Sequence, residues 1–209
     1  MYFLQDYAYR IYGYLSSGGV MMIPLLGVSF AMWVLIIHRA VFLRRLYLKH
    51  MPRREAGQLI RENRQPAPQY QGVNALLVRA FLARRCGRPE LDVHILDETV
   101  LSVVVSLDRH QSAINILAGV APLLGLLGTV TGMIVTFDVI TQFGTGNVRA
   151  LAGGISEALI TTETGLLISI PGLYMSGFLA QRATTLKQRV ASAGIYLKRF
   201  ITEAAQPKC

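Results

Sequence analysis

The sequence predicts an all-α membrane protein with three transmembrane helices, and its composition and charge distribution both indicate this fold class. Only 16% of the 209 residues are charged, whereas a typical soluble domain has about 25%. Hydrophobic residues make up 52% of the chain. Three long stretches carry almost no charge, and one helix needs about 20 mostly apolar residues to cross a bilayer.

The predicted transmembrane helices cover residues 17–38, 111–137 and 158–181. The first two lie in stretches without Lys, Arg, Asp or Glu. The third is also uncharged from residue 164 to residue 181, and extending it back to Ala158 adds one carboxylate, Glu163. Three such stretches are difficult to explain in a soluble protein of this size.

Residues 1–16 predict a short interfacial amphipathic helix before the first span. Four apolar or aromatic side chains share one helical face there: Phe3, Tyr7, Ile11 and Tyr14. Tyrosine favours the boundary between membrane and water. A frayed terminus is the alternative interpretation.

The distribution of Lys and Arg predicts the orientation of the spans. Segment 38–110 contains thirteen of the 21 basic residues, and the tail from residue 182 contains six. Basic residues remain in the cytoplasm, so 39–110 is predicted to be a cytoplasmic helical loop and 182–209 a cytoplasmic helical tail. The N-terminus and the 138–157 loop, with one basic residue each, are predicted to lie outside. This charge favours contact with anionic phospholipids over a role in nucleic-acid binding.

The cytoplasmic loop has its own helical pattern. Residues 52–63 and 72–87 favour two short helices, separated by the breaker QPAPQYQG. Pro89 is suited to the first turn of a third helix, and the sequence predicts one helix from there to Phe137, about 70 Å long. Because the hydrocarbon needs only about 30 Å, the second and third spans are predicted to extend into the cytoplasm. A separate cytoplasmic hairpin is the alternative.

Two stripes of small or hydroxyl side chains follow the second and third spans at helical spacing. The first stripe comprises Ala118, Pro122, Gly125, Thr129, Gly132 and Thr136. The second comprises Ala158, Thr162, Gly165, Ser169, Gly172 and Ser176. Small faces allow close helix packing in lipid, and hydroxyls also suit the wall of a polar space. The sequence leaves both interpretations open.

Two carboxylates lie near the start of the third span. Intramembrane carboxylates are functional candidates by default, and Thr129, Thr162 and Glu163 are expected at a similar depth. Alternatively, Glu163 lies among the lipid headgroups and Glu157 is a helix-start carboxylate stabilised by the helix dipole. The four histidines are scattered without ligand spacing, so the sequence predicts no enzyme, metal site or cofactor.

Two motifs carry a family resemblance. Residues 121–132 (APLLGLLGTVTG) and 155–171 (ISEALITTETGLLISIP, of the form IxEALxxTxxGLxxxIP) resemble the second- and third-helix signatures of the MotA/TolQ/ExbB proton-channel family. The resemblance implies a homo-pentamer in the bacterial inner membrane, with a periplasmic N-terminus and a central pore. It also implies two ExbD-like single-span partners inside the pore, whose aspartate carries protons, and transmission of the motion to a TonB-like protein.

The resemblance implies that Thr129 and Thr162 are pore threonines and that Glu157 is the glutamate of the EAL motif. The full predicted pore-lining set is Thr129, Thr162, Glu157, Glu163, Gly125, Gly132, Thr136, Gly165 and Ser169. Glu163 departs from the commoner family pattern, and the TTETGL form favours the ExbB branch. The expected function is an ExbB-like proton-channel subunit that energises TonB. A TolQ-like subunit and a non-conducting membrane scaffold are the alternatives.

Overall fold

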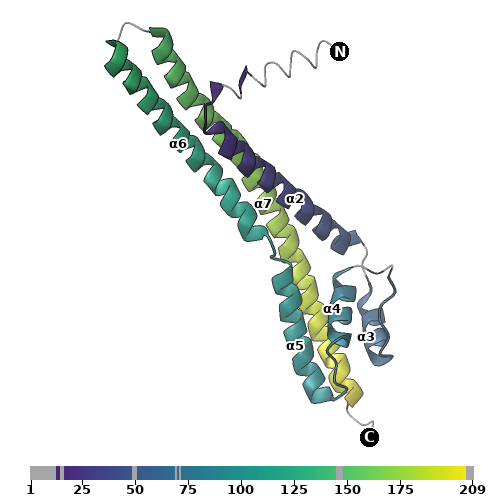
Figure 1. Cartoon of the computed structure of the whole chain (residues 1–209). Helices are drawn as coiled ribbons and strands as arrows, with labels where there is room; N and C mark the ends of the chain where they lie inside the picture. The colour runs from purple at the N-terminus through teal and green to yellow at the C-terminus, as the bar shows by residue number, and fades with distance from the viewer. Residues whose placement is uncertain are drawn as a thin grey trace, which may run out of the picture. The chain divides into compact units, whose positions relative to one another are not determined.

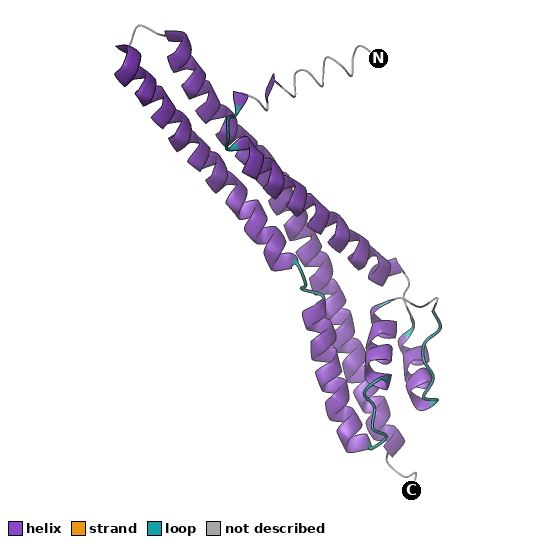
Figure 2. Cartoon of the chain, viewed as in Figure 1, coloured by secondary structure: helices purple, strands orange, loops and turns teal. Residues whose placement is uncertain are grey.

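The computed structural model describes residues 13–14, 17–48, 51–68, 70, 72–144 and 148–205, and these residues form helices and loops without a strand (Figure 2). The predicted helix over residues 1–16 lies outside this part, apart from Gly13 and Tyr14, which are helical. Within the described ranges the long helices are α2 (Met22–Leu48), α3 (Arg53–Arg61), α4 (Val73–Leu82), α5 (Pro89–Ser106), α6 (Gln111–Phe143) and α7 (Val148–Ala205).

Among the described residues, three helical stretches are long and apolar enough to cross a membrane: Met22–Tyr47, Pro89–Phe143, which includes a turn at residues 107–110, and Leu151–Thr202. They match the three spans expected from the sequence in number and order. The structure is therefore that of an all-α protein with three apolar helices. The cytoplasmic and periplasmic assignments of its loops stay predictions.

The chain divides into two compact units. The first contains residues up to Ile36 and Ala113–Ser176, and the second contains Ile37–Ser112 and Gly177–Cys209. In the first unit, α6 and the first part of α7 lie side by side (Figure 1). Their outward faces carry exposed large apolar side chains, including Leu126, Val130, Leu167 and Ile170, as expected for surfaces that meet lipid or other membrane helices.

The second unit has a core of large aliphatic side chains and Phe81, all fully buried. Asp92, 2% exposed, holds the connection between α4 and α5 in place. Its carboxylate accepts hydrogen bonds from the backbone N–H groups of Cys86 (3.0 Å) and Gly87 (3.2 Å), and it forms an ion pair with Arg85. As predicted, α5 begins at Pro89, where the missing N–H costs nothing.

The predicted continuous helix from Pro89 to Phe137 is wrong. Helix α5 ends at Ser106, a turn follows at residues 107–110, and α6 begins at Gln111. His110 adopts a positive φ of 66°, which ends helical geometry without a glycine or proline. The buried guanidinium of Arg39 donates hydrogen bonds to the carbonyl oxygens of Leu107 (3.1 Å) and Arg109. This contact from α2 provides partners for carbonyls that a continuous helix would have satisfied internally.

The helices continue past three predicted boundaries of the spans, at residues 38, 137 and 158. Helix α2 continues past residue 38 to Leu48, so the predicted 39–110 loop starts inside a helix. Residues 138–143 and 148–157 are helical as well, although the predicted 138–157 loop contains GTGN and the adjacent glycines Gly153 and Gly154. The predicted helical extension of the third span is confirmed, since α7 runs without interruption for 58 residues.

Candidate functional site

Glycines allow the backbones of α6 and α7 to come into direct contact. A Cβ atom added at Gly165 would lie 2.8 Å from the carbonyl oxygen of Ala121 and 3.1 Å from Cα of Gly125. One added at Gly132 would lie 2.9 Å from Cβ of Ala158. Residue numbers fall on α7 as they rise on α6, so the helices are antiparallel. Only glycine leaves room for this approach, which small residues make favourable between helices in lipid.

Hydroxyl groups on α7 bond across this contact. Thr162 donates from Oγ1 to the carbonyl oxygen of Gly125 at 3.2 Å, and Ser169 donates to the carbonyl oxygen of Ala118 at 2.8 Å. Ser176 donates to the side-chain oxygen of Asn115. We call this glycine-lined, hydroxyl-bonded contact between residues 115–136 and 154–176 the α6–α7 seam. Interhelical hydrogen bonds of this kind contribute about 0.6–2 kcal/mol in membranes.

The centre of the seam differs by one residue from the predicted stripes. On α6 the buried positions are Ile114, Ala118, Ala121, Gly125, Gly128, Gly132 and Thr136. Pro122 and Thr129, which the predicted stripe contained, are half-buried at its flank. On α7, Thr161 is buried and lies against Gly128, whereas Thr162 is half-buried. Adjacent small residues gave no signal to choose between these registers, so Gly128 and Thr161 were missed.

Thr129 and Thr162 flank the seam on the same side. Each follows a central residue, Gly128 or Thr161, by one position, and in antiparallel helices equal rotations lead to the same edge. On α7, the opposite edge carries Thr164, whose Oγ1 lies 3.2 Å from the Tyr14 hydroxyl. The two predicted pore threonines therefore share the edge opposite to the one that contacts Tyr14. Thr129 also donates to the carbonyl oxygen of Leu126 in its own helix at 2.6 Å.

The remaining predicted pore residues of the seam serve helix packing. Thr136 is buried, donates to the carbonyl oxygen of Gly132 at 2.9 Å and lies against Gly154. Gly125, Gly132 and Gly165 occupy the contact itself, which is the packing role that the sequence left open. That these residues also line a pore stays a prediction, because it depends on other chains.

Glu157 packs against the chain just before α2. Its half-buried carboxylate occupies the space that a Cβ atom at Gly19 would fill, and Gly19 has a positive φ of 61°. The positive φ favours glycine at this position, and any side chain there would displace the Glu157 carboxylate. The carboxylate therefore lies beside the start of α2, where the positive end of a helix dipole stabilises negative charge.

Glu163 lies apart from the seam. It is exposed, and one turn away on either side along α7 are Leu159 and Leu167, exposed by 66% and 69%. Within one chain, Glu163 is rotated away from the edge that Thr129 and Thr162 share. The expected similar depth of the three residues in the membrane stays a prediction. In the described part of the chain, this carboxylate has no ion pair.

The seam coincides with the match to known proteins. The sequence profile described as the MotA/TolQ/ExbB proton channel family matches residues 69–192, more than half of the chain. The chain belongs to this family. Among its relatives, the ExbB-like protein 3 of Synechocystis sp. is 29% identical over 199 residues, covering 88% of this chain and 93% of the relative. ExbB-like protein 1 of the same organism is 28% identical, covering 90% and 77%.

A shorter match reaches the biopolymer transport protein ExbB of Salmonella typhimurium, 32% identical over 92 residues, which cover 44% of this chain and 38% of the relative. The resemblance predicted from the two motifs is thus confirmed, and the chain is most like ExbB. Family membership and three apolar helices together make it a multi-pass membrane protein.

Proposed function

We propose that this chain is an ExbB-like subunit of a proton channel in the bacterial inner membrane. With an ExbD-like single-span partner, it converts proton-motive force into mechanical work on a TonB-like protein. The observation that carries the proposal is the position of Thr129 and Thr162 on one edge of the seam, inside the two family signatures.

The threonine hydroxyls on this edge suit the polar wall of a proton path. An ion in hydrocarbon is very unfavourable, so a proton path needs a polar lining and a titratable carrier. Threonine supplies polarity without fixed charge, and the seam keeps both threonines on a rigid helix pair. The carrier is then the aspartate of the ExbD-like partner, around which five copies of this chain would place ten threonine hydroxyls.

Reconstitution into proteoliposomes containing a pH-sensitive dye tests the proposal. Vesicles with the chain and its ExbD-like partner should acidify when a membrane potential drives protons inward, whereas vesicles with the chain alone should show little uptake. Thr162→Val should lower uptake by the complex about tenfold or more, because it removes the hydroxyl but keeps the shape. Thr162→Ser should retain most of it. The tenfold loss expected for Thr162→Val corresponds to roughly 1.4 kcal/mol in the barrier to proton transfer.

Thr184→Val is the matched control. Thr184 is an exposed threonine on the same helix that bonds only to its own Ala180 carbonyl. Equal uptake by the chain alone and by the complex would refute the assignment of the carrier to the partner. Full uptake by an assembled Thr162→Val complex would instead favour the scaffold alternative, which the glycine packing of the seam supports.

A TolQ-like role is the second candidate within the family. The relatives described above are named ExbB or ExbB-like, which favours the TonB-linked role. Co-purification of the tagged chain from its native membrane distinguishes the two, because each branch retains a different periplasm-spanning partner.

A further inference from the structure

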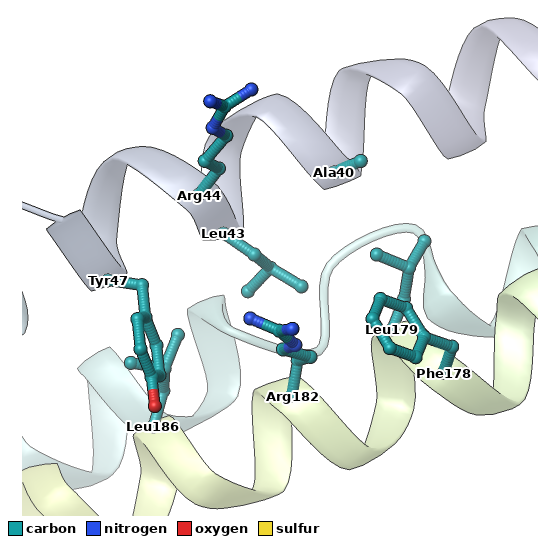
Figure 3. Close-up of a pocket in the computed structure, with 8 residues that line it drawn as sticks. All are labelled: Ala40, Leu43, Arg44, Tyr47, Phe178, Leu179, Arg182 and Leu186. Carbon is teal, nitrogen blue, oxygen red and sulfur yellow. The ribbon is translucent and has the colours of Figure 1, made fainter.

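A cavity of about 370 Å³ lies in the second unit, between the end of α2 and the middle of α7 (Figure 3). Leu43 from α2 and Leu179 from α7 form apolar parts of its lining and are almost fully buried. Tyr47 and Phe178 lie at its sides, and the guanidinium of Arg182 extends between them toward α2. The site thus combines an apolar base, two aromatic rings and a cation.

The aromatic rings hold Arg182 in place. The guanidinium carbon lies 4.9 Å from the centre of the Phe178 ring and 5.6 Å from that of Tyr47. On the same Tyr47 ring, the guanidinium carbon of Arg189 lies 4.5 Å from the centre, and its Nη2 lies 3.1 Å from the tyrosine hydroxyl. These contacts position two cations beside the Tyr47 ring. Arg189 uses an N–H group on the tyrosine hydroxyl, whereas no hydrogen bond of the Arg182 guanidinium to a described residue is observed, so its N–H groups are available to a ligand.

The charge of Arg182 is not balanced within the described chain. Further along α7, Lys187 pairs with Asp108 at 2.6 Å and Lys198 pairs with Asp97 at 2.6 Å. Arg182 has no carboxylate partner among the described residues, and neither does Arg44 at the rim, whose guanidinium points away from α7 in Figure 3. The cavity therefore has a net positive charge, since neither arginine that lines it pairs with a carboxylate of the described residues.

Arg182 lies at a place in the sequence that suits contact with a lipid headgroup. Arg182 is the first charged residue after the uncharged stretch 164–181 of α7. Exposed apolar side chains precede it on the same helix, including Tyr174 and Phe178. A ligand that occupies this cavity thus has an anionic group at Arg182 and a hydrophobic part toward the apolar stretch. Soluble phosphate has the first of these features but lacks the second.

We infer that this cavity binds an anionic phospholipid, with the headgroup phosphate on the guanidinium of Arg182 and an acyl chain along Phe178. Guanidinium and phosphate form paired, charge-assisted hydrogen bonds. The bound lipid stabilises the contact between the end of α2 and α7. This inference is independent of proton conduction, and its test measures lipid alone.

Native mass spectrometry of the full chain in mild detergent tests the site. The protein is incubated with phosphatidylglycerol or with phosphatidylcholine, and bound lipid is counted. Phosphatidylglycerol should be retained in preference to phosphatidylcholine. Arg182→Gln should lower its occupancy roughly fivefold, which corresponds to about 1 kcal/mol per basic residue at an anionic surface. Arg182→Lys keeps the charge but not the paired geometry, so its phosphatidylglycerol occupancy should lie between those of the unmodified chain and Arg182→Gln.

Arg45→Gln is the matched control, because Arg45 is an exposed basic residue of α2 that does not line this cavity. Its lipid occupancy should equal that of the unmodified chain. An equal thermal unfolding midpoint for all variants in phosphatidylcholine shows that each is folded. The inference is overturned if both lipids bind equally, if Arg182→Gln retains phosphatidylglycerol, or if inorganic phosphate displaces the lipid, which would indicate an ion site.

Discussion

Thr162 on α7 donates a hydrogen bond to the backbone carbonyl oxygen of Gly125 on α6 at 3.2 Å. The bond exists because Gly125 and Gly165 bring the helix backbones close enough for a short side chain to reach across. One predicted pore threonine is thus fixed by the same glycines that pack the seam. Packing and lining, which the sequence presents as alternatives, depend on each other at this position.

The first prediction concerns the close approach at Gly165. Gly165→Ala should destabilise the helix pair by about 1–3 kcal/mol, because the added Cβ atom meets backbone on α6 that cannot move aside. Gly177→Ala on the same helix has nothing within 4 Å of the added atom, so it should be neutral or stabilising. Thermal unfolding midpoints in detergent measure both. An unchanged midpoint for Gly165→Ala would contradict the observed seam.

The second prediction links Gly19 to Glu157. Gly19→Ala should impair proton uptake by the complex in the same direction as Glu157→Gln, because the new methyl group displaces the carboxylate from its present position. The double variant should be no worse than the more impaired single variant, as expected for two residues with one shared contact. Gly27→Ala on α2 meets open space and is the control. Additive effects in the dye assay would show that the two residues act independently.

Most of the fold was predictable from the sequence because it follows from composition. Long uncharged stretches identify the spans, and Pro89 marks the start of α5. The break at residues 107–110 was not predictable, because no glycine or proline occurs there and the helical pattern continues. It is stabilised by Arg39, which is about 70 residues away in sequence. Such tertiary contacts leave no local signal.

The candidate site was predictable to within one residue. Helical spacing identified both faces, but Gly128 and Thr129 both belong to the small or hydroxyl class, and only packing places Gly128 at the centre. For Glu163, the sequence predicted the apolar surroundings but not the face of α7 on which the residue lies. Its place among apolar residues was evident, whereas its direction relative to Thr162 depends on how α6 and α7 meet.

The third prediction concerns the break between α5 and α6. Arg39→Met should speed hydrogen exchange of the backbone amides in residues 107–113 and lower stability by about 1–3 kcal/mol, because two carbonyls of the turn lose a charged donor. Arg45→Met, at an exposed position of the same helix, should leave exchange there unchanged. If both variants exchange alike, Arg39 does not hold the turn.

The fourth prediction concerns the buried carboxylate of Asp92. Asp92→Asn should lower stability by about 1–3 kcal/mol, because the amide replaces one acceptor oxygen with a donor and removes the ion pair with Arg85. Asp97→Asn breaks only an exposed pair with Lys198, so its effect should stay below about 1 kcal/mol. Urea unfolding followed by circular dichroism compares the two. Equal losses would mean that burial of Asp92 adds nothing.

The fifth prediction concerns the exposed carboxylate of Glu163, which should be covered in the assembled complex. Leaving a charge against lipid costs up to about 2.5–3.5 kcal/mol, the value at the centre of a span, and Leu159 and Leu167 on either side offer Glu163 no polar partner. In a chain whose two cysteines are replaced by serine, Glu163→Cys should react readily with a water-soluble maleimide when the chain is dispersed in detergent. It should react at least tenfold more slowly in the assembled complex with the ExbD-like partner, because a second chain then covers it. Ser156→Cys, an exposed position two turns earlier on α7, reports labelling nearer the helix end. Equal labelling of Glu163→Cys in both states would show that this face is open in the complex.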